Sequence, residues 1–330
     1  MYVSYYYKVS VKTVTKVVNS CKKSKYFCFY SPNVLHLHSF VQRKHNRILK
    51  TGIVFEGGGM RGLFSTGIAD VLLEEGITVD GMVGVSAGAC LCCNYKSRQV
   101  GRALRYNVLL RNDPKYMSVR NLIKTGDFIG ADYAYHYIPT YVDYFDREAF
   151  KANPMVFEVV CTNVYTGKPV YRQIDEVTDQ TLDWIRASAS LPLVSKPVTL
   201  DGFTMLDGGM SDAIPLRHWQ EKGYEKNIVV LTQPRDYRKK KTSLVPLFKL
   251  IMRKYPKVVE AMAHRHEMYN SQLDYVLEQE RLGKTLLIFP PHSLDIGRIE
   301  QNEAKMRAVH QLGIETARAH LSQIREFLNV

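Results

Sequence analysis

The stretch GIVFEGGGMRGLFSTGIADVLLEEGITVDGMVGVSAG, from Gly52 to Gly88, decides the fold of this chain. Its first residues form a short apolar run typical of a buried strand, which leads into a loop of consecutive glycines. Apolar residues at helical spacing begin at Leu63, and Gly76 closes that helix. A second strand starts near Ile77 and reaches a G-x-S-x-G turn, after which residues 89–100 are expected to form one helix. This order predicts a parallel β/α unit within a three-layer α/β domain whose central sheet is mainly parallel.

The charge of the chain is distributed very unevenly. The 330 residues carry a net charge of +13, and ten of the 45 Lys and Arg residues fall in the first 50 positions, where no Asp or Glu occurs. The remaining 280 residues therefore carry only +3. A protein that binds nucleic acid usually has a basic folded domain, so we expect no nucleic-acid partner.

The sequence predicts three parts. Residues 1–49 form a basic arm that we expect to be poorly ordered, and its histidines at 36, 38 and 45 lack the acidic or Cys partners of a metal site. Residues 50–232 form the catalytic domain, and residues 233–330 a mainly helical C-terminal extension with one late strand at 286–289 and a helix at 300–328 broken near Gly313. The oligomeric state is left open.

Targeting features are missing from the sequence as given. No apolar run approaches the roughly 18 residues of a membrane span. The N-terminal residues also lack the apolar core of a signal peptide. Six cysteines, three of them clustered at Cys90, Cys92 and Cys93, do not resemble a disulfide framework. We expect a cytoplasmic protein whose clustered cysteines pack in the core.

The glycine loop has two interpretations. Gly57, Gly59 and Gly62 satisfy the G-x-G-x-x-G pattern of dinucleotide sites, but such a site needs an acidic residue at the end of the second strand. Asp80 stands at the beginning of that strand, and its end carries Ser86. A serine on a tight turn beside consecutive glycines favours acyl transfer instead, with the loop N–H groups as an oxyanion hole.

Three motifs then resemble those of the patatin-like phospholipase family. They are G-G-G-x-R-G at residues 57–62, G-x-S-x-G at residues 84–88 and D-G-G at residues 207–209. The resemblance extends from about Lys50 to Thr232, and the C-terminal extension is similar to that of a bacterial subgroup. It implies a Ser-Asp dyad with Ser86 as nucleophile and Asp207 as base, without a metal or another cofactor.

The residues around the two Asp-Gly pairs agree with that implication. Asp201-Gly202 lies between alternating apolar residues and predicts a β-hairpin with a type I′ turn. Asp207 instead follows a strand and precedes two glycines, which leave room for its carboxylate to reach another strand end. The histidines at 136, 218, 264, 266 and 292 follow Ser86, so a Ser-His-Asp order stays formally open.

Two segments could contact lipid. The tyrosine-rich stretch at residues 132–145 is either part of an acyl groove or lid, or a partly buried connection. The cluster Arg238, Lys239, Lys240 and Lys241 precedes an apolar run and suits peripheral contact with an anionic membrane. A solvated loop before a packed helix is the alternative for the second segment.

The function predicted from these features is a serine-dependent hydrolase of lipid or other acyl esters. Ser86 and Asp207 would carry the chemistry, and Gly57, Gly58 and Gly59, with the charge of Arg61, would stabilise the oxyanion. Two alternatives stay open: a catalytically silent lipid- or protein-binding module of the same fold, and a nucleotide-binding protein that uses the glycine loop.

Overall fold

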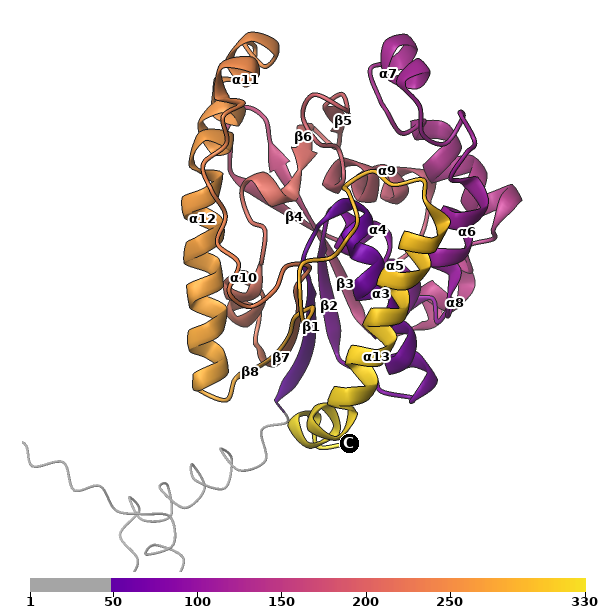
Figure 1. Cartoon of the computed structure of the whole chain (residues 1–330), viewed down its shortest axis with the longest axis vertical. Helices are drawn as coiled ribbons and strands as arrows, with labels where there is room; N and C mark the ends of the chain where they lie inside the picture. The colour runs from indigo at the N-terminus through magenta and orange to yellow at the C-terminus, as the bar shows by residue number, and fades with distance from the viewer. Residues whose placement is uncertain (1–48) are drawn as a thin grey trace, which may run out of the picture. The chain divides into compact units, whose positions relative to one another are not determined.

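The structure, a computed structural model, describes residues 49–330, so the predictions for the basic arm, except Leu49, lie outside it. Residues 50–330 form one compact unit around an eight-stranded sheet (Figure 1). The strands of this unit are β1 (Lys50–Phe55), β2 (Gly81–Val85), β3 (Val156–Asn163), β4 (Pro169–Gln173), β5 (Val198–Leu200), β6 (Phe203–Asp207), β7 (Tyr224–Val230) and β8 (Thr285–Ile288).

The strand order is β5-β6-β3-β2-β1-β7-β8, and β4 pairs with β3. Strands β3, β2, β1, β7 and β8 run parallel to one another, whereas β4 and β6 pair with β3, and β5 pairs with β6, in antiparallel fashion. The carboxyl ends of β1 and β2 therefore meet at one edge of the sheet, where loops that follow parallel strands commonly build a site.

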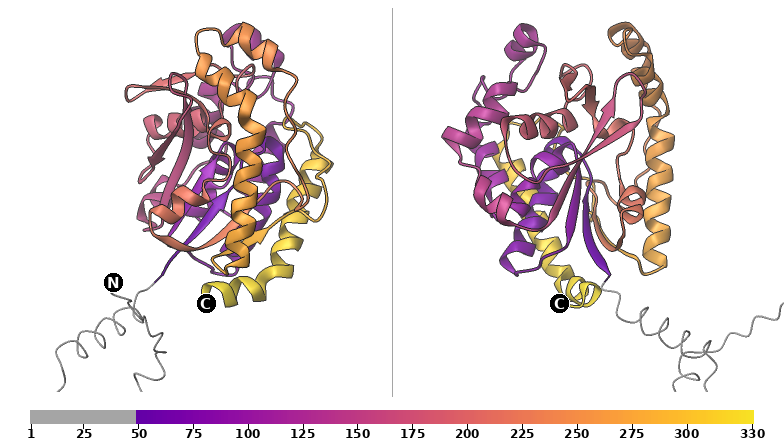
Figure 2. Two further views of the ribbon diagram at one scale, coloured as in Figure 1. Left: turned by 90° about the vertical axis from the view of Figure 1, so that its left-hand side faces the viewer. Right: turned by 180° about the vertical axis from the view of Figure 1, so that it is seen from behind.

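Side chains of the central strands alternate between two buried faces, as a sheet covered on both sides requires. Ile53, in register with Met82, points to one face, and Val54, in register with Val83, points to the other. Helices α3 (Gly62–Glu74) and α13 (Glu303–Leu328) cover the first face; α10 (Leu216–Glu221) and α12 (Pro256–Arg281) cover the second (Figure 2). The predicted three-layer α/β class with a helical C-terminal part is confirmed.

The remaining helices are short and surround the carboxyl edge of the sheet and its first face. They are η1 (Gly59–Arg61), α4 (Ala87–Cys90), α5 (Cys93–Lys96), α6 (Arg102–Leu110), α7 (Val119–Thr125), the π-helix η2 (Tyr133–Val142), α8 (Arg147–Ala152), α9 (Asp179–Ser188), η3 (Gly208–Met210) and α11 (Val245–Ile251). Strand β8 joins the sheet beside β7, so the segment after residue 232 contributes a strand as well as helices. The predicted domain boundary at residues 232/233 stays a prediction.

Two local predictions about helices are wrong. The single helix expected over residues 89–100 is divided into α4 and α5, because the Asn94 side chain donates to the Leu91 carbonyl and the Cys93 thiol to the Cys90 carbonyl. The break expected near Gly313 does not occur, since α13 is continuous from Glu303 to Leu328.

Gly313 serves a packing role instead, at the crossing of α13 and α3. A Cβ atom on Gly313 would lie 2.1 Å from the Phe64 carbonyl oxygen, and one on Gly67 would lie 2.2 Å from the His310 carbonyl oxygen. Facing glycines thus let the two helix backbones touch. His310 adds a buried hydrogen bond of 2.9 Å to Asp70 across the same contact.

The predicted hairpin at Asp201-Gly202 is confirmed. Asp201 and Gly202 have φ values of 50° and 78°, the two positive values that a type I′ turn requires. The turn joins β5 to β6 with Leu200 opposite Phe203. The other end of β6, at Asp207, therefore lies at the edge of the sheet where β2 ends.

Candidate active site

Ser86 occupies a strained turn directly after β2. Its φ of 54° and ψ of −121° are unusual for a residue with a side chain. The flanking glycines make this turn sterically possible, because a Cβ on Gly88 would lie 2.3 Å from the Phe55 carbonyl oxygen and one on Gly84 would lie 2.6 Å from the Gly88 carbonyl oxygen. The turn raises the serine above the sheet edge, as expected for a nucleophile on such an elbow.

A second serine fixes the backbone of that turn. The Ser86 N–H donates to Ser188 Oγ over 2.9 Å, and the Ser188 hydroxyl donates to the Val160 carbonyl over 2.6 Å. Ser188 lies at the end of α9 and is completely buried. It connects the turn to β3, the neighbouring strand. No motif in the sequence singles out Ser188 for this role.

Asp207 lies at the end of β6 and is only 1% exposed. Its Oδ1 accepts a hydrogen bond of 2.8 Å from the Gly209 N–H, whereas Oδ2 is buried and has no hydrogen-bond partner among residues 49–330. Burial raises the pKa of Asp207, and the Ser86 hydroxyl, Arg265, the Gly209 N–H and Arg298 act against that rise. The structure thus places a carboxylate with a free oxygen near the Ser86 hydroxyl.

The glycine loop approaches the same serine. A Cβ on Gly57 would lie 2.7 Å from the Val85 carbonyl oxygen and 2.8 Å from Ser86 Cβ. The N–H groups of Gly57, Gly58 and Gly59 donate to no other described residue. Gly57, Gly58, Gly59, Arg61, Ser86 and Asp207 all line one small polar cavity. All six predicted site residues are therefore brought together, and their roles stay predictions.

A larger cavity of about 350 Å³ also borders Ser86. Its wall is mostly apolar and includes Met117, Tyr135, Ile138 and Phe145. Of the two interpretations of the tyrosine-rich stretch, the structure favours the wall of a groove. A cavity of this size and character suits a hydrocarbon chain.

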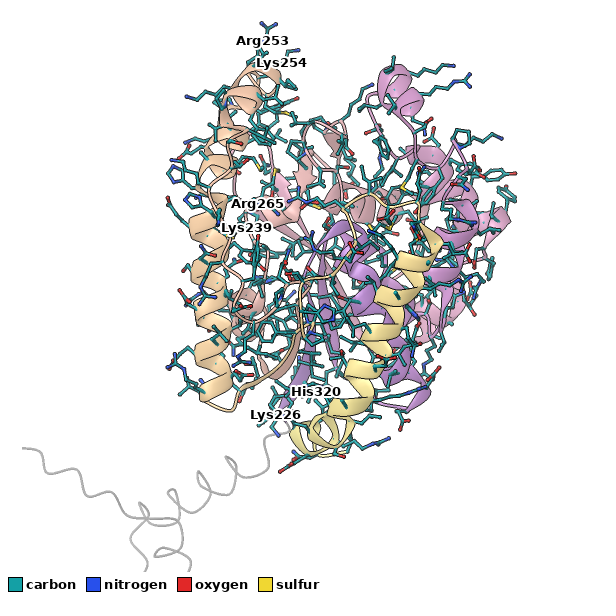
Figure 3. The ribbon with its side chains drawn as sticks, viewed as in Figure 1. Lys226, Lys239, Arg253, Lys254, Arg265 and His320 are labelled. Carbon is teal, nitrogen blue, oxygen red and sulfur yellow. The ribbon has the colours of Figure 1, made fainter. Side chains whose placement is uncertain are left out.

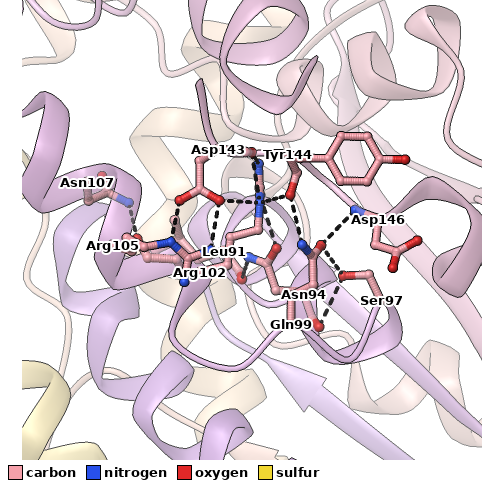
Figure 4. Close-up of polar contacts among 11 residues, drawn as sticks. Leu91, Asn94, Ser97, Gln99, Arg102, Arg105, Asn107, Asp143, Tyr144 and Asp146 are labelled. Carbon is pink, nitrogen blue, oxygen red and sulfur yellow. Dashed lines mark hydrogen bonds and ion pairs between the residues drawn. The ribbon is translucent and has the colours of Figure 1, made fainter. Parts of the chain in front are cut away.

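A polar network holds this wall in place (Figure 4). The Arg102 guanidinium donates to the Asp143 carbonyl oxygen over 2.6 Å, and Arg105 Nε and Nη2 donate to the two carboxylate oxygens of Asp143 over 2.7 and 2.8 Å. Gln99 donates to the Tyr144 carbonyl over 2.8 Å. These contacts tie the segment after η2 to α6 and so fix one side of the cavity.

The three clustered cysteines pack in or against the core. Cys92 and Cys93 are buried in the core as predicted, and Cys93 also borders the apolar cavity together with the half-buried Cys90. Burial raises the pKa of Cys90 to about 12 and that of Cys93 to about 11, so both are thiols at neutral pH. Among residues 49–330 no group of three or more His, Cys, Asp or Glu side chains could hold a metal ion.

The five histidines considered for a triad lie away from both cavities. His218, for example, hydrogen-bonds to Glu158 over 2.5 Å and stacks on Tyr171 with ring centroids 3.5 Å apart. His292 is exposed and hydrogen-bonds to the Ser293 carbonyl over 3.2 Å. None of the five lines a cavity that includes Ser86.

The predicted membrane contact at residues 238–241 needs one correction. Lys239 does not face outward: its ammonium lies 4.3 Å from the Tyr269 ring centroid, and the side chain lines the small polar cavity. Arg238 forms an exposed ion pair of 3.0 Å with Asp274, and Lys240 and Lys241 are exposed. Two further residues of that cavity, Arg265 and Arg298, were missed because no motif marks them.

This chain is similar to known proteins of one class. Residues 53–218 match the family model for patatin-like phospholipases, so this chain belongs to that family. The matched range includes the glycine loop, Ser86 and Asp207. Residues 255–329 match a second model, a domain of unknown function (DUF6363).

Several individual proteins are similar to this chain at low identity. The uncharacterized protein YjjU of Escherichia coli is 27% identical over 198 residues, which cover 56% of this chain and 52% of YjjU. Lysophospholipase nte1 of Aspergillus oryzae is 25% identical over 179 residues, 52% of this chain and 11% of that protein. The chain therefore spans about half the length of the first relative and a small part of the second.

Among solved structures, VipD from Legionella pneumophila aligns with a TM-score of 0.43 and 13% identity, covering 83% of this chain and 67% of VipD. ExoU from Pseudomonas aeruginosa, solved with SpcU, aligns with a TM-score of 0.35 and 14% identity, covering 83% of this chain and 52% of that chain. No helix within residues 49–330 is both long and apolar enough to cross a membrane.

Proposed function

We propose that the chain is a serine-dependent lipid acyl hydrolase, a phospholipase or esterase that uses a Ser-Asp dyad. One observation supports this most strongly: the buried Asp207 keeps one carboxylate oxygen without a partner among the described residues, beside a serine on a strained turn. An unpaired buried carboxylate oxygen is costly for a merely structural residue. It is what a general base for Ser86 would need.

The chemistry would proceed in two steps. Ser86 Oγ attacks the ester carbonyl while Asp207 Oδ2 takes the hydroxyl proton, and the N–H groups of Gly57, Gly58 and Gly59 stabilise the oxyanion. The C–O bond to the alcohol breaks, and the alcohol leaves with the proton from Asp207. A water molecule, deprotonated by Asp207, then attacks the acyl-serine ester and releases the carboxylic acid, and Ser86 recovers its proton.

The substrate would place its acyl chain in the apolar cavity of about 350 Å³. Ile138 and Phe145 in its wall are buried, and burial of apolar chain surface stabilises binding by roughly 25 cal/mol per Å². The Arg61 charge lies on the polar side of Ser86, with the glycine loop. This division favours an ester that is apolar on the acyl side and polar on the other.

The test is hydrolysis of a panel of acyl esters and phospholipids by the wild type and matched variants. Ser86→Ala should abolish turnover, and Asp207→Asn should lower kcat by about 10² to 10⁴, as loss of a general base does. Asp201→Asn, which changes the Asp of the other Asp-Gly pair, is the control. If the wild type hydrolyses no ester, or folded Asp207→Asn is as active as Asp201→Asn, the alternative of a silent binding module is favoured.

We also propose that the exposed basic residues Arg238, Lys240 and Lys241 bring the protein to anionic membranes. Helix α11 follows them and exposes Leu247, at 40%, and Leu250, at 71%. Each basic residue near an anionic surface contributes on the order of 1 kcal/mol at low salt. Replacing the three by Gln should reduce sedimentation with phosphatidylglycerol vesicles, and an unchanged bound fraction would refute this contact.

A further inference from the structure

Four cationic side chains from separate segments line the small polar cavity beside Ser86. They are Arg61 after the glycine loop, Lys239 before α11, Arg265 in α12 and Arg298 between β8 and α13. Figure 3 labels Lys239 and Arg265 near one another, beside the second face of the sheet. Three of the four therefore come from the chain after residue 232.

The protein does not balance the charge of this cation cluster. Two carboxylates, Glu56 and Asp207, line the same cavity. Glu56 Oε2 already accepts hydrogen bonds from the Thr232 N–H over 2.6 Å and from Thr232 Oγ1 over 3.0 Å. Within residues 49–330, none of the four cations forms an ion pair shorter than 4.0 Å. The described lining therefore has a net positive charge.

Individual members of the cluster are poorly satisfied. Arg61 Nε is buried and lacks a hydrogen-bond partner among the described residues. Burial, together with the charges of Arg265, Arg298 and Arg61, lowers the pKa of Lys239 to about 8. Burial also lowers the pKa of Arg265, whose Nε donates to the Gly209 carbonyl over 2.6 Å. Like charges held together in this way cost free energy that a bound anion would recover.

The chemistry of the cluster fits a phosphate group. Arginine guanidinium groups donate paired hydrogen bonds to phosphate oxygens, and a lysine ammonium adds a compact positive charge. The glycine loop, whose N–H groups have no other described acceptor, borders the same cavity. Several donors directed at one small space distinguish this cluster from scattered surface cations.

The position of the cluster relates the anion to the ester. Ser86, Arg265 and Arg298 border both the small polar cavity and the large apolar one. A ligand with its reacting carbonyl at Ser86 can therefore extend its acyl chain into the apolar cavity and an anionic group toward the cations. Lipid esters of glycerol phosphate have this arrangement.

We propose that Arg61, Lys239, Arg265 and Arg298 form a phosphate-binding subsite, which makes the substrate a phosphate-bearing lipid ester. The ester chemistry rests on the proposed function. Arg265 and Arg298 lie in the segment that matches the domain of unknown function, so the inference gives that segment a role in substrate selection.

The first experiment compares two soluble esters with the same acyl chain, octanoyl-glycerol 3-phosphate and octanoyl-glycerol. The ratio of their kcat/KM values should exceed one in the wild type and should fall at least tenfold in Lys239→Gln and in Arg298→Gln. Lys284→Gln, at an exposed lysine directly before β8, is the matched control and should keep the wild-type ratio. Melting curves verify that each variant is folded.

The second experiment titrates inorganic phosphate into the same proteins by calorimetry, which requires no turnover. The Kd should rise at least tenfold in Lys239→Gln and Arg298→Gln relative to Lys284→Gln. Binding of phosphate together with an unchanged ester ratio would identify free phosphate as the ligand and overturn the lipid assignment. A changed kcat/KM ratio without binding of free phosphate would show that the subsite binds phosphate only when it is part of the lipid.

The two proposals fail in distinguishable ways. If the wild type hydrolyses both esters but neither the ratio nor phosphate binding changes in the folded variants, the subsite is wrong and the hydrolase stands. If neither ester is hydrolysed but phosphate binding weakens in the variants, the hydrolase is wrong and the anion site stands. Absence of both hydrolysis and phosphate binding overturns both.

Discussion

Removal of the Ser188 hydroxyl should destabilise the turn that carries Ser86. In Ser188→Ala the buried Ser86 N–H loses its described acceptor at 2.9 Å, and the Val160 carbonyl loses a donor at 2.6 Å. A buried polar group left without a partner costs about 1–3 kcal/mol, so two such groups should cost about 2–4 kcal/mol once partial relaxation is allowed. At roughly 2 °C per kcal/mol for a domain of this size, the Tm should fall by about 4–8 °C.

The assay combines thermal unfolding with ester hydrolysis. We expect kcat to fall as well, because the strained backbone of Ser86 is no longer held against β3. Ser190→Ala is the control. The Ser190 hydroxyl donates to the Arg186 carbonyl, and that carbonyl still accepts from the Ala189 N–H after the hydroxyl is removed. If Ser188→Ala melts and turns over like Ser190→Ala, the hydrogen bonds of Ser188 do not hold the nucleophile turn.

Four further predictions concern Asp207, Gly57 and Gly313. Burial raises the pKa of Asp207 above its ordinary 3.8, so kcat should decline as the pH falls through that raised value. If this decline of kcat at low pH disappears in His218→Ala, Asp207 is not the group that titrates. A raised pKa also means that the ionised Asp207 destabilises the folded state at neutral pH. Urea unfolding of Asp207→Asn should therefore show no loss of stability at pH 7. Gly57→Ala should lower kcat by about a hundredfold with the fold retained, because its Cβ would lie 2.8 Å from Ser86 Cβ; unchanged kcat would exclude the loop as oxyanion hole. Gly313→Ala should lower the free energy of unfolding by more than about 2 kcal/mol, because the added Cβ does not fit between α13 and α3. In an ordinary helix, Ala in place of Gly would instead raise this free energy by about 1 kcal/mol. A stabilised variant would therefore refute the tight helix crossing.

The fold around Ser86 could be predicted because its information is local. The strand, glycine loop, helix and second strand occupy residues 52–88, and their periodicity and glycines specify both the elements and the turn. The hairpin at Asp201-Gly202 is local in the same sense, since two adjacent residues determine its turn. The resemblance of three motifs to a known family added the connection from Ser86 to Asp207.

The contacts that the sequence did not reveal are distant along the chain. Ser188 is 102 residues from Ser86, and nothing in its immediate sequence shows that α9 ends against β2. Lys239 was assigned to the membrane surface because it lies in a basic run, and only packing against Tyr269 turns it inward. Gly313 was expected to break a helix because an isolated glycine weakens helices, but close approach of a second helix reverses that meaning.

Labelling with a fluorophosphonate, followed by peptide mapping, tests whether Ser86 and Asp207 form a dyad, because the reagent reacts only with an activated serine. We expect a single modified serine, Ser86, with a labelling rate at least a hundredfold lower in folded Asp207→Asn and unchanged in Asp201→Asn. A folded wild-type protein that leaves Ser86 unlabelled, or that carries the label on another serine, would exclude Ser86 as the nucleophile.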